Sequence, residues 1–213
     1  MCKVTGFVGL DYHPTGVQVC VMSEAGKVLV NRKVRDVASA VAEVAAGCGV
    51  SDVRAAVEAC SGAASLADEL ILHHGWEVTL AHPGYVNRMK QNPDKHDLGD
   101  AKLLADLVRV GYVPGVWLPP KAIRELRTLV RYRQQIAAER RTTKLRIRAV
   151  LRENRIAQPE GRAWTVAWLA WLRSTKAIDG QVRYVINCHL KRLKQQEAEL
   201  KRLEQRLACA TRH

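Results

Sequence analysis

The chain has 213 residues, enough for one sizeable domain or for a domain with an appendage. No apolar run approaches the roughly 20 residues that a membrane-spanning helix needs, and residues 6–22 have the pattern of two strands around a turn rather than that of a signal peptide. Six cysteines are scattered without a Cys-x-x-Cys pair, which argues against a zinc site and favours reduced thiols in a cytoplasmic protein.

The net charge of +13 is unevenly distributed. Residues 1–114 contain 11 Lys/Arg and 13 Asp/Glu, whereas residues 115–213 contain 23 and 8. A large positive excess in one segment favours a nucleic-acid partner, although a solvated basic helix surface remains the alternative. Because a proline-rich stretch coincides with the change in charge, we expect two domains, residues 1–114 and 115–213.

The first part of the chain has the pattern of an α/β domain. Three strands are expected to form an antiparallel meander with Asp11 at the tip of the first, and Asp36 can cap the helix that follows. Strands then alternate with helices, which predicts a mixed sheet flanked by helices. The expected strands span residues 4–10, 17–22, 28–34, 53–57 and 76–81, and the expected helices span residues 37–46, 63–74, 85–90 and 97–110.

The second part of the chain has helical periodicity. A helix is expected over residues 121–153, with arginines between its apolar positions. Trp164, Trp168 and Trp171 would share one helix face, where packing is favoured over base stacking. From residue 181 onwards, apolar residues recur every seven positions, which predicts a coiled coil with either the 121–153 helix folded back or another protomer.

Four acids are candidates for one functional site. Asp97 and Asp100 would lie on the first turn of a helix, where capping alone would explain them. Asp11 and Glu58, however, each close a strand, and sites in such sheets lie at the carboxyl ends of strands. Four carboxylates held together repel unless cations bind, and two Mg²⁺ ions suit such an oxygen-rich set. We therefore predict that all four are catalytic metal ligands.

The order of these acids resembles the DEDD transposases of bacterial insertion sequences, whose N-terminal domain is similar to the Holliday-junction resolvase RuvC. The resemblance runs over nearly the whole chain. The matching segments are Val8 to Asp11, Glu58 to Cys60 with Gly62, Pro83 with Tyr85 and Val86, Lys95 to Ala101, Val113 with Pro114, and the arginine-rich helix that ends at Glu153.

This resemblance implies a RuvC-like, ribonuclease-H-like domain followed by a coiled-coil region, in a bacterial cytoplasmic protein. It implies an RNA-guided recombinase that joins element and target DNA, and self-association into a dimer or tetramer through residues 121–153 and 181–209. A further domain with a nucleophilic serine would complete it, so this chain would be the N-terminal half and incomplete alone. The expected nucleic-acid contacts are Lys95, Arg124, Arg127, Arg131, Arg133, Arg140, Arg141, Lys144 and Arg148.

Two other hypotheses fit the same residues. The first is a self-sufficient Mg²⁺-dependent nuclease that cuts branched DNA. The second is a non-enzymatic, basic coiled-coil adaptor for nucleic acids, in which the acids are merely caps.

Overall fold

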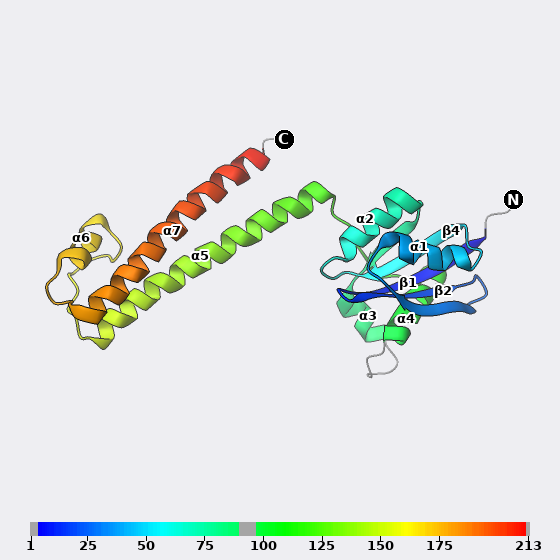
Figure 1. Cartoon of the computed structure of the whole chain (residues 1–213), viewed down its shortest axis with the longest axis horizontal. Coiled ribbons are helices and arrows are strands. Elements are labelled where there is room, and N and C mark those ends of the chain that lie inside the picture. Colours follow the sequence, from blue (N-terminus) through cyan, green and yellow to red (C-terminus); the bar gives the residue numbers. More distant parts are fainter. Residues whose placement is uncertain (1–3, 90–96, 212–213) are drawn as a thin grey trace. The chain divides into compact units, whose positions relative to one another are not determined.

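The computed structural model of the protein describes residues 4–89 and 97–211, and the chain forms two compact units (Figure 1). The first unit spans residues 1–119 and the second spans residues 120–213. The boundary expected from the sequence, at residue 114, lies before a short strand that pairs with the sheet of the first unit.

The first unit contains a six-stranded mixed sheet, with the strand order β3-β2-β1-β4-β5-β6. Strand β2 is antiparallel to β1 and β3, β4 and β5 are parallel to β1, and β6 is antiparallel to β5. The expected mixed sheet is therefore confirmed, with β6 as an addition. The strands are β1 (Thr5–His13), β2 (Gly16–Met22), β3 (Val28–Val34), β4 (Asp52–Glu58), β5 (Glu77–Ala81) and β6 (Gly115–Val116).

Helices cover both faces of this sheet. Successive residues of a strand point to opposite faces, so Val8 and Leu10 pack in the core formed with α1 and α2. Phe7 lies on the other face, in a cluster with residues of α4. The helices of the first unit are α1 (Ala38–Gly47), α2 (Ala63–His74), α3 (Pro83–Met89) and α4 (Asp97–Arg109).

The start of α1 differs from the sequence-based expectation. Val37 occupies the N-cap position, and no side chain caps the helix there, so the prediction that Asp36 caps it is wrong. The Asp36 carboxylate instead accepts a hydrogen bond of 2.8 Å from the Tyr12 hydroxyl. This bond raises the pKa of Tyr12 and connects the end of β1 to the segment before α1.

The second unit is an antiparallel pair of long helices with a shorter helix at one end. Helix α5 (Lys121–Glu153) folds back onto α7 (Gly180–Ala210), and Arg133 donates to Glu204 across the pair at 2.7 Å. The sequence pattern predicts either the 121–153 helix or another protomer as the partner of the last helix, and within this chain the partner is the 121–153 helix. Helix α6 (Val166–Ser174) packs against this pair through the buried Trp168, as expected for a packing role.

None of the helices in residues 4–89 and 97–211 has the length and apolar character that a membrane crossing requires. The described cysteines have free thiols: Cys20, Cys48, Cys60, Cys188 and Cys209.

Gln196 offers a test of the α5–α7 contact. It occupies a core position of the heptad pattern, is 8% exposed, and its Oε1 has no hydrogen-bond partner among the described residues. Since an unsatisfied buried polar group costs about 1–3 kcal/mol, Gln196→Leu should raise the free energy of unfolding of the second unit by about 1–2 kcal/mol. Thermal denaturation would measure the change. The exposed neighbour provides the control, because Gln195→Leu should alter stability by less than about 0.5 kcal/mol. Destabilisation by Gln196→Leu would contradict the prediction.

Candidate metal centre

The carboxyl ends of three parallel strands, β1, β4 and β5, lie at one edge of the sheet. Gly9 pairs with Ala56 and Leu10 pairs with Val57, so Asp11 and Glu58 take the next position on neighbouring strands. Adjacent strands are about 4.8 Å apart. Asp11 lies within β1 rather than at its tip, because β1 continues to His13.

Alternation along each strand directs both acids to the face that α4 covers. Asp11 shares a strand face with Gly9, and Glu58 shares one with Ala56. Ala56 packs in a cluster with Leu104 of α4, which identifies this face. The two strand acids therefore project on the same side of the sheet as the helix that carries the two later aspartates.

A close approach of α4 to β1 brings the helix acids over the sheet. A Cβ atom at Gly9 would lie 1.9 Å from the Ala101 carbonyl oxygen and 2.4 Å from the Ala105 nitrogen. Ala101 and Ala105 are fully buried and have the smallest side chains that a chiral residue offers. Asp97 is the first residue of α4 and Asp100 is one turn further and buried, so this contact sets the position of both.

A histidine joins the strand acid to the helix acid. The Nε2 atom of His13 lies 3.2 Å from Asp11 Oδ2 and 3.6 Å from Asp97 Oδ1. One ligand atom from each of these three residues lies within 4.8 Å of the others. The site predicted from the sequence does not include His13. The available signal was its spacing, because an Asp-x-His sequence on a strand puts both side chains on one face.

The electrostatics show that the acids influence one another. Burial raises the pKa of Asp11, His13 lowers it, and the charges of Asp97 and Asp100 raise it further. Burial also raises the pKa of the Cys60 thiol, a backbone hydrogen bond with Ala63 lowers it, and the charges of Glu58 and Asp11 raise it. Asp11 is thus within the electrostatic range of both helix acids, and Glu58 and Asp11 act on the same thiol.

The four predicted acids differ in how closely they approach the group around His13. Asp11 and Asp97 belong to the close group with His13, Asp100 acts on Asp11 through its charge, and Glu58 occupies the neighbouring strand outside that group. This donor set, oxygen-rich, partly buried and mutually repulsive, fits a divalent cation, which would relieve the repulsion.

The predicted nucleic-acid contacts have varied surroundings. Arg133 pairs with Glu204, the Lys144 ammonium lies 5.0 Å from the centre of the Trp164 ring, and Arg140 is partly buried. Arg124 and Arg127 have interactions within the protein. Lys95 lies outside the described residues. The exposed members of the set are Arg127, Arg131, Arg141 and Arg148.

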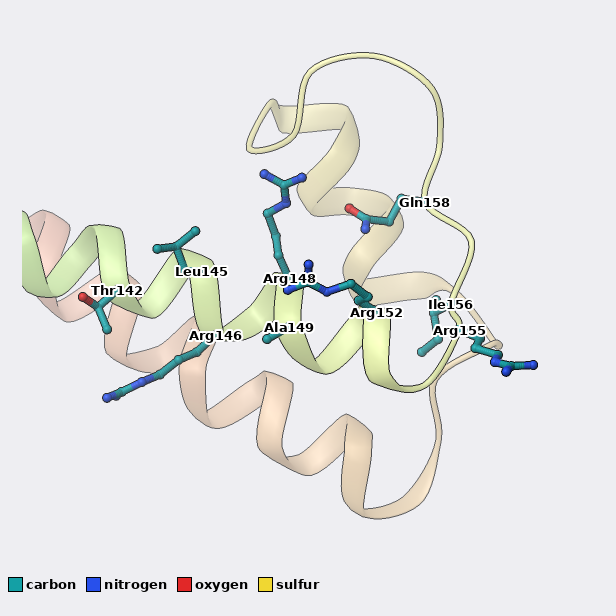
Figure 2. Close-up of a pocket in the computed structure, with 9 residues that line it drawn as sticks. All are labelled: Thr142, Leu145, Arg146, Arg148, Ala149, Arg152, Arg155, Ile156 and Gln158. Carbon is teal, nitrogen blue, oxygen red and sulfur yellow. The ribbon is translucent and has the colours of Figure 1, made fainter.

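Four arginines line a groove of about 780 Å³ at the C-terminal end of α5. Figure 2 shows Arg146, Arg148 and Arg152 along α5 and Arg155 in the loop that follows it. All four are exposed. Leu145 and Ala149 contribute an apolar part of the lining, and the described residues provide no ion-pair partner for any of the four guanidinium groups.

Two comparisons of the sequence with known proteins both match transposases. A family model of DEDD transposases of the IS110 type, described as a transposase, matches residues 8–155, which is more than half of the chain. A protein of Sinorhizobium fredii named as the transposase y4qE is 31% identical over 104 residues, or 49% of this chain. The chain spans about a quarter of that relative, since the match covers 27% of its length.

Among solved structures, RuvC of T. thermophilus in complex with a Holliday-junction substrate matches 54% of this chain and 100% of its own chain. Its sequence identity is 16% and the TM-score is 0.37, a likeness too weak to support a conclusion by itself. The match begins within β1 and includes all four acids and the whole of α5. The chain therefore belongs to the family of IS110-type DEDD transposases.

Proposed function

We propose that this chain supplies the metal-binding domain and the nucleic-acid-binding helices of a transposase that cleaves and exchanges DNA strands with Mg²⁺. The observation that carries the proposal is the meeting of Asp11 and Asp97, which are distant in the sequence, around His13. Membership of the transposase family supports DNA as the substrate.

In this proposal Asp11, Glu58, Asp97 and Asp100 would hold the metal. When bound, two Mg²⁺ ions would stabilise the attacking and leaving oxygens of a phosphodiester. The protein's own contribution is rigid positioning, because two acids stand on paired strands and two on a helix packed directly against them. The basic helices would bind the phosphodiester backbone and set its orientation.

The proposal extends to partners that the family resemblance implies. These are a guide RNA held by both units, a further domain that carries a nucleophilic serine, and a dimer or tetramer formed through residues 121–153 and 181–209. The positive charge of the second part of the chain supports an RNA or DNA partner there.

A plasmid carrying a cruciform would test the function. We expect Mg²⁺ to raise the thermal midpoint of the chain, Asp11→Ala to abolish that shift, and the chain alone to bind the cruciform without cutting it. Cutting that Asp11→Ala abolishes would instead support a self-sufficient nuclease. If Mg²⁺ gives no shift and Asp97→Asn leaves stability and nucleic-acid binding unchanged, the chain is an adaptor and the proposal fails.

The arginine groove on α5 gives a prediction for the nucleic-acid interface. Four guanidinium groups without an ion-pair partner among the described residues lie within a ten-residue stretch, so they can contact several backbone phosphates. Each phosphate contact contributes close to one unit to the slope of log K against log salt. Replacing Arg146, Arg148, Arg152 and Arg155 with glutamine should therefore reduce that slope by about 3 to 4.

Fluorescence anisotropy with a DNA duplex and an RNA stem-loop of equal length would measure these slopes, and would show which polymer the groove prefers. The matched control removes four exposed positive charges from α7 by changing Lys191, Arg192, Lys194 and Lys201 to glutamine. Equal loss of slope in both variants would mean that total charge, rather than the groove, determines binding.

A further inference from the structure

We infer that His13 is a nitrogen ligand of the metal centre, so that the site is a mixed nitrogen–oxygen site rather than an all-carboxylate one. The inference rests on the proposed function, since it concerns the same cation. His13 lies two residues after Asp11 on β1 and therefore projects from the same face of the sheet. Its side chain is 33% exposed, between the more buried Asp11 and the more open Asp97.

The distances suit shared coordination. Octahedral ligands at about 2.1 Å from an ion lie about 3.0 Å apart when adjacent and about 4.2 Å apart when opposite. His13 Nε2 lies 3.2 Å from Asp11 Oδ2 and 3.6 Å from Asp97 Oδ1, between these limits. All three ligand atoms lie within 4.8 Å of one another, so one ion can be reached by all of them with small side-chain movements.

A nitrogen ligand changes which ions the site prefers. Mg²⁺ favours oxygen ligands, whereas imidazole is a better ligand for first-row transition ions. A site with His13 should therefore bind Mn²⁺ more tightly than Mg²⁺, and the difference should depend on the imidazole. An all-carboxylate site lacks this source of preference.

The short distances around His13 also have a second explanation, and the experiment must distinguish a metal ligand from a competitor of the metal. The His13 ring could instead only hydrogen-bond Asp11 and form an ion pair with Asp97, and it would then have to leave when an ion binds. A ligand and a competitor have opposite effects on removal. Loss of a ligand weakens metal binding, whereas loss of a competitor strengthens it.

Mn²⁺ added to the full chain provides the test, because electron spin echo envelope modulation detects a coordinated imidazole nitrogen. We expect a ¹⁴N signal that His13→Ala abolishes, together with an Mn²⁺ affinity about 10-fold lower and an Mg²⁺ affinity changed by less than about 3-fold. The control is His82→Ala, at an exposed histidine that directly follows β5, which should change neither.

Three results would overturn the inference. Asp11-dependent Mn²⁺ binding without a ¹⁴N signal would remove His13 from the ligand set while leaving the proposed function intact. Tighter Mn²⁺ binding by the His13→Ala protein would make His13 a competitor. Failure of Mn²⁺ and Mg²⁺ to bind in an Asp11-dependent way would remove both the inference and the proposed function.

Discussion

Replacing Gly9 with alanine should displace α4 from the sheet and destroy the candidate metal centre. The added Cβ would lie 1.9 Å from the Ala101 carbonyl oxygen, and this neighbour is helix backbone that cannot rotate away. Overpacking of a core commonly costs 1–3 kcal/mol, and a backbone clash should cost at least about 3 kcal/mol. We expect a fall in the thermal midpoint of the first unit of more than about 10 °C.

The same substitution should abolish stabilisation by Mg²⁺, because Asp97 and Asp100 move with α4. Gly99→Ala is the matched control on that helix, since a Cβ there meets no atom within 4 Å. Alanine in place of an exposed helical glycine should stabilise by up to about 1 kcal/mol and leave the Mg²⁺ response unchanged. A Gly9→Ala protein that melts like the parent and still responds to Mg²⁺ would show that the close contact does not position the site.

Asp11→Asn should make the metal-free protein more stable at neutral pH while removing its response to Mg²⁺. Burial is the largest cause of the raised pKa of Asp11, and the charges of Asp97 and Asp100 add to it. The ionised carboxylate therefore costs stability in the folded protein, and asparagine removes this cost. Differential scanning fluorimetry with and without Mg²⁺ would measure both effects.

The stability difference between the Asp11→Asn protein and its parent should depend on pH. Below the ordinary pKa of 3.8 the carboxyl is protonated in both states and contributes nothing. As the pH rises from there to the raised pKa of the folded state, the unfolded chain loses its proton first, so stability falls. The advantage of Asp11→Asn should thus be absent near pH 3 and constant by pH 7. A variant less stable than the parent at pH 7 would contradict the assignment.

Sequence reasoning located the sheet and the acids because both depend on local pattern. Apolar alternation marked β1 to β5, and Asp11 and Glu58 stood out because each follows a buried run. The two-residue β6 has no periodicity of its own, since its pairing with β5 depends on how the chain returns after α4. Asp36 does not cap α1, and its carboxylate instead accepts a hydrogen bond from Tyr12, which is distant in the sequence.

The site's composition was harder to predict than its position. His13 is marked in the sequence only by its Asp-x-His spacing, and its contact with Asp97 depends on α4 bringing that residue to within 3.6 Å. That approach in turn requires Gly9 beside Ala101 and Ala105, a tertiary contact between small residues that periodicity does not reveal. The heptad pattern, in contrast, placed Ile186, Leu193, Leu200 and Leu203 in the helix contact, where all four are buried.

Anomalous diffraction from crystals soaked in Mn²⁺ would test most directly whether acids from two strands and one helix share a cation. We expect a peak within coordination distance of Asp11 and Asp97, with Glu58 or Asp100 completing the ligands of that ion or of a second one. A peak elsewhere, or density in which Asp11 and Asp97 bind no common ion at saturating Mn²⁺, would contradict it.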